Sequence, residues 1–232
     1  MLESIAISAL LGAVLASFAI SLSECRLSSL FRFSVCDNCG QPLSVKQLAP
    51  IFSSFLKIAC RCGYIPSLRY GALEAFLAIA FSINTFVFGP TFFSVLMNAF
   101  TFISFYISLL DWKTFQIPLS SLCFLAILGC VWSYLQADTL IAFFVTIIGT
   151  LSFYLFWKFL RKTKPMGGGD VLLFAFSGLW LSLDLIPVFL FVAGAGGVLT
   201  PRFFKGTNAR FPFTPAILFA LWVSILGSFA RY

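Results

Sequence analysis

The sequence contains no histidine and few charged residues. The lack of histidine excludes His-based acid–base catalysis, Ser-His and Cys-His nucleophile systems, and histidine metal ligands. Charged residues make up 10% of the 232 residues, whereas hydrophobic residues make up 60% and include 31 Phe. A soluble domain could not bury so much apolar surface, so we expect lipid to surround most of the chain. An enzyme with this composition would work with carboxylates, cysteines, lysines or a metal.

Apolar segments that are long enough, or nearly so, to cross a bilayer recur along the whole chain. The first has no positive n-region and follows Glu3, so it is interpreted as a retained span and not as a cleaved signal. The sequence therefore predicts an all-α polytopic membrane protein with about eight transmembrane helices. The segments are 4–23, 71–88, 91–110, 118–136, 139–160, 171–184, 185–200 and 213–230.

The basic residues predict the orientation of these spans. If the N-terminus lies outside, a single basic residue, Arg231, falls on the outer side. By the positive-inside rule the other side is cytoplasmic, and the formal net charge of +7 then reflects membrane orientation and not nucleic-acid binding. The inner side receives Arg26, Arg32, Lys46, Lys57, Arg61, Arg69, Lys113, Lys158, Arg161, Lys162, Lys164, Arg202, Lys205 and Arg210.

Two aspartates lie where predicted spans meet the cytoplasm. Asp111, in "SLLDWKTFQIP", ends one apolar span, and taken alone it could be a solvated loop acid beside Lys113. Asp170 follows Gly167, Gly168 and Gly169 and opens another apolar run, so taken alone it could cap a helix N-terminus. Acids at membrane depth are costly and usually functional, which favours a joint role for the two.

Two carboxylates within hydrogen-bond reach do not both ionise easily and share a proton. One can then act as a general base on water while the other, protonated, polarises a carbonyl group. This is aspartic-protease chemistry, and it predicts Asp111 and Asp170 as catalytic residues. The run Gly167 to Gly169 would let a substrate peptide approach the backbone closely and would permit a hinge before Asp170.

The hydrophilic stretch 24–70 contains two cysteine pairs, "CDNCG" and "CRCG". Paired cysteines, each pair followed by glycine and about twenty residues apart, are typical of a structural Cys₄ zinc site. A disulfide is the alternative, but we expect this loop on the reducing cytoplasmic side. Free structural thiols are a second alternative, which two clustered pairs make less favourable. The predicted zinc ligands are Cys36, Cys39, Cys60 and Cys62.

The chain resembles the type IV prepilin peptidases, membrane aspartyl proteases of the GxGD type, over essentially its whole length. The cysteine loop leads into "IPSLRYGALEAF", "DWKTFQIP" resembles the first aspartate motif, and "GGGD" stands at the GxGD position. "FPFTP" stands where the family usually has F-G-P, so Thr214 takes the place of a glycine. Leu119 and Leu172 also replace polar residues that are usual there.

The resemblance implies that Asp111 and Asp170 are the catalytic aspartates and that the four cysteines bind zinc. It implies a bacterial inner-membrane enzyme whose substrates are type IV prepilins or the pseudopilins of type II secretion. Their short basic leader, ending in glycine, would be cut on the cytoplasmic side. Family members with the cysteine loop often also N-methylate the new terminus with S-adenosylmethionine, although no residue here independently predicts a methyl-donor site.

The predicted domains are a first transmembrane helix (1–23), a zinc-knuckle domain (24–70) and a transmembrane protease domain (71–232). Three other functions remain open from the sequence. An intramembrane GxGD protease of another class would place its acids deeper in the spans. A transporter would need more polar residues at mid-span and some repeat symmetry, and a non-catalytic assembly protein would leave the paired acids without a role.

Overall fold

The computed structural model describes residues 1–24, 36, 38–41, 59–63, 67–136, 139–161, 167–203 and 212–229. The chain divides into two compact units, Met1–Phe102 and Ile103–Tyr232, which we describe separately. This division leaves the domain boundaries at 23 and 70 as predictions. Much of the predicted loop domain lies outside the described residues, as do Arg26, Arg32, Lys46, Lys57, Lys162, Lys164, Lys205, Arg210 and Arg231.

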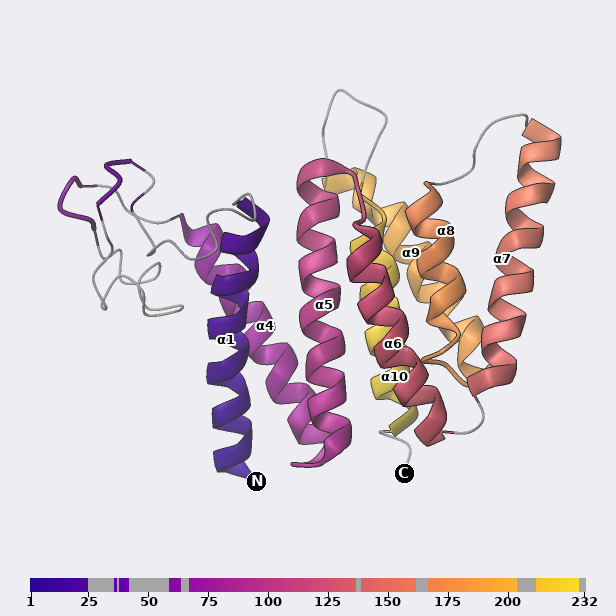
Figure 1. Cartoon of the computed structure of the whole chain (residues 1–232), viewed down its shortest axis with the longest axis horizontal. Coiled ribbons are helices and arrows are strands. Elements are labelled where there is room, and N and C mark those ends of the chain that lie inside the picture. The colour runs from indigo at the N-terminus through magenta and orange to yellow at the C-terminus, as the bar shows by residue number, and fades with distance from the viewer. Residues whose placement is uncertain are drawn as a thin grey trace. The chain divides into compact units, whose positions relative to one another are not determined.

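The described residues form eight α-helices and a short 3₁₀ helix, η2, with no strand among them (Figure 1). This result confirms the predicted all-α fold and the number of helices. The elements are α1 (Leu2–Glu24), α4 (Leu68–Phe88), α5 (Phe92–Thr114), α6 (Leu119–Gln136), α7 (Thr139–Arg161), α8 (Gly168–Ser177), η2 (Leu183–Leu185), α9 (Ile186–Phe203) and α10 (Thr214–Phe229).

Five of these helices, α1 and α4 to α7, are long and apolar enough to cross a membrane. The apolar stretches in the remaining part of the described chain are shorter: Gly168–Ser177, Leu183–Leu199 and Thr214–Phe229. The largest difference from the sequence prediction concerns segment 171–184, because α8 ends at Ser177 and a turn leads through η2 into α9. At ten residues α8 is too short to cross a bilayer by itself.

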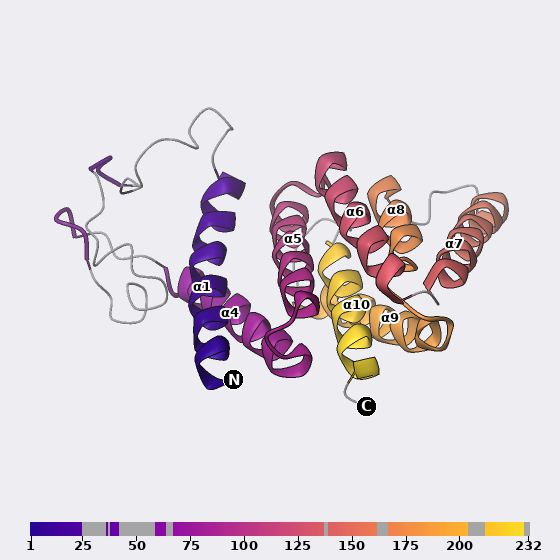
Figure 2. The ribbon, with the colours of Figure 1, turned by 60° about the horizontal axis from the view of Figure 1, so that its bottom comes forward.

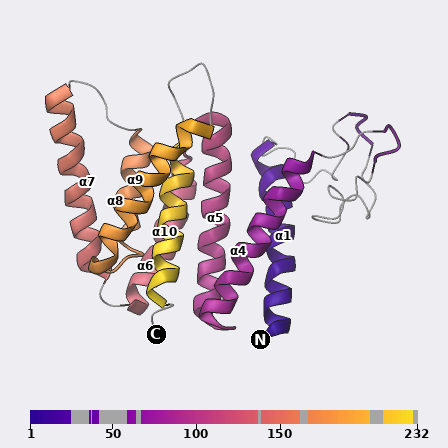
Figure 3. The same cartoon turned by 180° about the vertical axis from the view of Figure 1, so that it is seen from behind.

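In the first unit, α1 and α4 cross in close contact (Figures 1 and 3). A Cβ atom at Gly12 of α1 would lie 2.7 Å from the backbone oxygen of Leu77 in α4, and Ala16 and Ala19 are fully buried. Small residues at this spacing let two membrane helices approach closely. The hydroxyl of Ser17 donates a hydrogen bond to the buried carboxylate of Glu74, which ties the same pair of helices together.

The first unit also contains a buried amide cluster. The side-chain amide of Asn84 in α4 donates to Oδ1 of Asn98 at 3.0 Å and to Oγ1 of Thr101 at 2.9 Å, and both acceptors belong to α5. Asn84 has no exposed surface. Polar groups in an apolar environment must be paired with one another, so this cluster holds α5 against α4.

The second unit contains the end of α5 and the helices α6 to α10. Here α9 lies along α10, and α8 packs against α6, α7 and α10 (Figures 1 and 2). The rings of Trp132 in α6 and Trp180 after α8 are buried with their centroids 5.7 Å apart. In contrast, α7 exposes large apolar side chains, as expected for a surface in contact with lipid. These include Phe144, Ile148, Leu151, Leu155 and Phe159.

The contact between α7 and α8 yields a prediction on stability. A Cβ atom at Gly178 would lie 2.6 Å from Cα of Phe143 and 2.8 Å from the backbone oxygen of Ala142. Because these are backbone atoms of α7, we expect Gly178→Ala to destabilise the protein by about 1–3 kcal/mol. The measurement is thermal unfolding in detergent, followed by size-exclusion chromatography.

The matched control is Gly149→Ala in α7. A Cβ atom at Gly149 would meet no atom within 4 Å, and a helix-interior glycine costs about 0.5–1 kcal/mol relative to alanine. We therefore expect this control to melt at an equal or higher temperature. A Gly178→Ala variant that melts together with the control would contradict the close packing of α7 on α8.

Candidate functional site

Three helix ends meet at one end of the second unit: the last turn of α5, the first turn of α8 and the first turn of α10 (Figure 1). They carry Asp111, Asp170 and Thr214. The backbone N–H of Thr214 donates to Oδ2 of Asp111 at 3.3 Å, and its hydroxyl donates to Oδ1 of Asp170 at 3.2 Å. The two predicted aspartates are 59 residues apart in the sequence, and the structure brings both into contact with Thr214.

Asp111 lies inside α5 and not in the loop after it. The helix continues to Thr114, and the chain then leaves it through Phe115, whose φ of 54° is in the left-handed region. The residues from Trp112 to Phe115 are exposed, whereas Asp111 is only 7% exposed. A carboxylate at a helix C-terminus opposes the helix dipole, and the hydrogen bond from the N-terminus of α10 compensates for this placement.

Asp170 is the third residue of α8, and Gly167 is the N-cap. The backbone of Gly167 contributes a hydrogen bond to the Asp170 carboxylate. This is the back-reaching half of a capping box, so the helix-capping role that the sequence left open is present. The same carboxylate also interacts with Thr214 and, electrostatically, with Asp111. Asp170 can therefore cap α8 and form a pair with Asp111 at the same time.

The three predicted hinge glycines occupy different environments. A Cβ atom at Gly169 would lie 3.0–3.3 Å from side-chain atoms of Ile117, and one at Gly167 would lie 3.2 Å from Oδ2 of Asp170. One at Gly168 would have no described atom within 4 Å. Glycine at 169 thus allows the start of α8 to approach the α5–α6 connection, and glycine at 167 leaves room for the carboxylate of Asp170. A hinge at these residues stays a prediction.

The contact made by Thr214 was not predicted from the sequence, where this threonine differs from the glycine of the F-G-P element only as one residue in "FPFTP". A further signal was available, because proline is favoured in the first turn of a helix and Pro215 therefore indicates that a helix begins at this point. That the helix begins beside two acids from α5 and α8 depends on tertiary packing.

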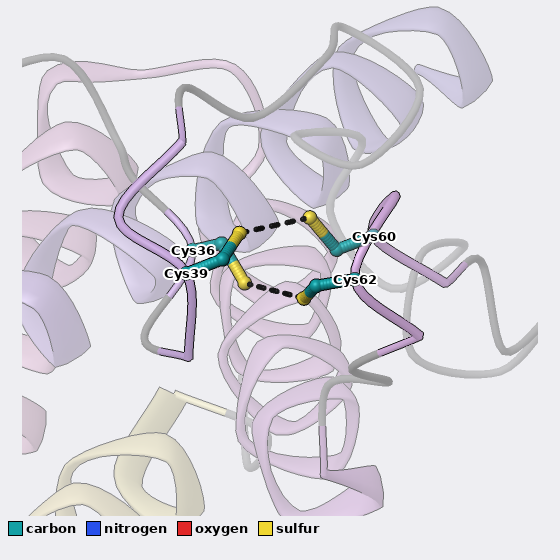
Figure 4. A group of neighbouring side chains, drawn as sticks. All are labelled: Cys36, Cys39, Cys60 and Cys62. Carbon is teal, nitrogen blue, oxygen red and sulfur yellow. Dashed lines mark hydrogen bonds between the residues drawn. The ribbon is translucent and has the colours of Figure 1, made fainter.

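The second candidate site is a cluster of four cysteines in the first unit (Figure 4). Sγ of Cys36 lies 3.7 Å from Sγ of Cys62, and Sγ of Cys39 lies 3.7 Å from Sγ of Cys60. All four sulfurs lie within 4.8 Å of one another. Tetrahedral zinc with Zn–S bonds of about 2.3 Å requires sulfurs about 3.8 Å apart, so the donor set and its spacing fit this ion.

Glycines shape both turns that carry these cysteines. Gly40 and Gly63 have positive φ values of 67° and 83°, in the region that glycine adopts without strain. The N–H of Gly40 donates to the carbonyl of Cys36, and the N–H of Gly63 donates to that of Cys60, both at 2.8 Å. A glycine with a left-handed backbone conformation therefore closes each of the two turns.

A bound cation would also change the ionisation of the four thiols. The backbone hydrogen bond from Gln41 lowers the pKa of Cys39, but desolvation and the three neighbouring sulfurs outweigh it and raise that pKa to about 12. Four thiolates cannot ionise side by side unless a cation compensates their charge. The described cysteines, including Cys123 and Cys130 of α6, form no disulfide with one another.

Comparison with known proteins supports the same assignment. Residues 98–201 match the model of the type IV leader peptidase family, and residues 7–88 match that of the bacterial peptidase A24 N-terminal domain. A prepilin leader peptidase/N-methyltransferase of Bacillus subtilis (strain 168) is 30% identical over 227 residues, covering 89% of this chain and 87% of the relative. The chain belongs to the type IV leader peptidase family.

Two further relatives of this leader peptidase carry the same description. The protein of Pectobacterium carotovorum subsp. carotovorum is 27% identical over 207 residues, covering 84% of this chain and 72% of the relative. That of Neisseria gonorrhoeae is 27% identical over 205 residues, covering 82% and 69%. No solved structure matches the chain.

Membership of this family makes the protein an aspartic peptidase and a multi-pass membrane protein. The four cysteines fall within the N-terminal match, and both Asp111 and Asp170 fall within the peptidase match. Thr214 lies beyond the peptidase match, although it contacts both acids.

Proposed function

We propose that Asp111 and Asp170 form the catalytic pair of an endopeptidase that removes the leader of type IV prepilins or type II secretion pseudopilins. One observation carries the proposal: both carboxylates are hydrogen-bonded to Thr214 where three helix ends meet. Because the two acids interact electrostatically, the pair is expected to hold one proton between them at the working pH.

In this mechanism the ionised carboxylate removes a proton from a water molecule as the oxygen attacks the scissile carbonyl carbon. The protonated carboxyl group donates its proton to the carbonyl oxygen, which forms a neutral tetrahedral intermediate. The carboxyl group that took the proton from water then donates it to the leaving nitrogen while the C–N bond breaks. The other carboxylate takes a proton back from a hydroxyl of the intermediate, so that the pair returns to its initial state. The partial burial of both acids limits competing water at this site.

We propose that the scissile bond lies at the cytoplasmic face. The acids occupy helix ends and not helix centres, which suits a cut between a soluble leader and the hydrophobic helix that follows it. Lys113 and Lys158 lie in the last turns of α5 and α7, at the same end of the second unit as the acids. This placement supports a cytoplasmic location of the acids by the positive-inside rule, and with α1, α4 and α5 each crossing the membrane we propose that the N-terminus lies outside.

We further propose that Cys36, Cys39, Cys60 and Cys62 bind a structural zinc ion, which has all four positions filled and would stabilise the fold of the loop. The names of the relatives support N-methylation of the new terminus as a second activity, with S-adenosylmethionine as the donor. When bound, that cofactor would supply the methyl group.

The test uses the full-length protein, reconstituted with a substrate that has a short basic leader ending in glycine before a hydrophobic helix. We expect a single cut after the glycine, and mass spectrometry of the product reads both the cut and any added methyl group. In the control substrate the glycine is replaced by leucine, and we expect little cleavage of it.

A second substrate, which carries the hydrophobic helix but no leader, distinguishes the nearest alternative. A cut in the middle of that helix would support an intramembrane protease of another class and contradict this proposal. Failure to cut the leader substrate would contradict the proposal as well, provided that the protein is folded and is reconstituted in both orientations.

A further inference from the structure

The position of Thr214 is fixed by its own burial and by the packing of the residue before it. It begins α10, it has no exposed surface, and the ring of Phe213 before it packs 6.0 Å from that of Phe174 in α8. On the other side Phe213 fits against Gly197 of α9, where a Cβ atom would lie 2.5 Å from the ring. The start of α10 is therefore fixed by both α8 and α9.

The first turn of α10 directs its donors toward the acids. Pro215 has no N–H, and the N–H of Ala216 donates to the carbonyl of Phe213 at 3.0 Å. The N–H of Thr214 is the first that the helix offers, and it points at Asp111. Because the positive end of a helix dipole favours negative charge, this geometry suits a carboxylate that must ionise.

The side-chain hydroxyl of Thr214 makes the contact with the second carboxylate. It donates to Oδ1 of Asp170 at 3.2 Å, and the side chain of Thr214 also interacts with Asp111. A single residue thus bonds both members of the pair from a fixed point. If either bond is lost, the corresponding carboxyl group is free to turn away from the other.

We infer that Thr214 is a positioning residue: its N–H and its hydroxyl hold the two carboxyl groups at the separation at which they share one proton. The inference rests on the proposed function of the aspartate pair. Thr214 does not exchange a proton with the substrate, and it acts through Asp111 and Asp170. This assigns a role to a residue outside the segment that matches the peptidase family model.

The test compares variants of the full-length protein on the leader substrate. Thr214→Val replaces the hydroxyl by a methyl group of similar size and keeps the N–H. Since hydrogen bonds to charged groups are strong, we expect kcat to fall about 10- to 100-fold while KM changes less than about threefold. Thr214→Ser keeps the hydroxyl, and we expect its kcat to stay within about threefold of the wild-type value.

The pH profile separates positioning from simple stabilisation. Loss of a donor to an ionised carboxylate makes ionisation harder, so the acidic limb of the kcat profile should move to higher pH in Thr214→Val. The matched control is Thr139→Val, since Thr139 is a buried threonine at the start of α7 whose hydroxyl donates to Ser133 at 2.5 Å. We expect this control to change the melting temperature and to leave the pH profile unmoved.

Thr214→Ala provides a second comparison if the valine variant does not fold. Ser and Ala variants with equal kcat and equal pH profiles would overturn the inference, and so would a Val variant with wild-type kcat. In both cases the wild type would still cleave and the proposed function would stand. A wild-type protein that cleaves no leader substrate would overturn the proposed function and this inference with it.

Discussion

Replacing Asp111 or Asp170 by asparagine is expected to lower kcat/KM for leader cleavage about a thousandfold or more. Asparagine keeps the size of aspartate and can still accept a hydrogen bond from Thr214, but it can neither remove a proton from water nor donate an acidic proton. Because the two acids act as a unit, the double variant should be no slower than the slower single variant. The rate of product formation, followed by mass spectrometry, measures both effects.

Asp184→Asn is the matched control for these variants. Asp184 lies exposed in η2, at the end of α8 opposite to Asp170, and its Oδ1 accepts a hydrogen bond from Ser182. Asp184→Asn removes the same charge from the second unit and leaves Asp111 and Asp170 unchanged. Cleavage by Asp111→Asn or Asp170→Asn at a rate close to that of this control would refute the catalytic assignment.

Loss of the metal is expected to be the second large effect. We expect the purified protein to contain about one zinc ion per chain and Cys36→Ser or Cys60→Ser to contain almost none, because three thiolates leave a structural site incomplete. Structural zinc sites in small peptides contribute about 10–16 kcal/mol of apparent binding free energy. The loop should therefore also become more sensitive to protease, which limited proteolysis and elemental analysis together measure.

Cys123→Ser serves as the control for the cysteine variants. Cys123 lies exposed on α6 and is not a member of the cluster, so its replacement should leave the zinc content unchanged. The proposed catalytic pair belongs to the second unit and the four clustered cysteines to the first, so cleavage should fall by a smaller factor in Cys36→Ser than in Asp111→Asn. Zinc retained at the wild-type level in both cluster variants would contradict the Cys₄ site.

The local chemistry of both sites could be predicted from the sequence because it depends on neighbouring residues. Gly40 and Gly63 follow their cysteines directly, and each turn closes within five residues, so spacing alone indicated the cluster. Segments of about twenty apolar residues likewise predicted α1 and α4 to α7, since a helix of this length satisfies its own backbone hydrogen bonds in lipid.

Segments governed by packing were predicted less well. Apolar composition predicted one span over 171–184, but α8 ends at Ser177, and Gly178, which follows it, lies against the backbone of α7. Asp111 was placed at the end of its span, yet α5 continues to Thr114. The hydrophobicity of a segment indicates which residues avoid water. It does not indicate where a helix ends, because helix ends also depend on tertiary packing.

The sequence by itself determined that the protein is helical and apolar and that it lacks histidine chemistry, and it predicted two acids and four cysteines as the reactive groups. These are properties of composition and of short-range spacing. The tertiary structure alone decided that Asp111 and Asp170 meet on Thr214, because this contact depends on how α8, α9 and α10 fit together through Phe174, Phe213 and Gly197. Hydrogen bonds between residues far apart in the chain follow from packing geometry, which no local pattern encodes.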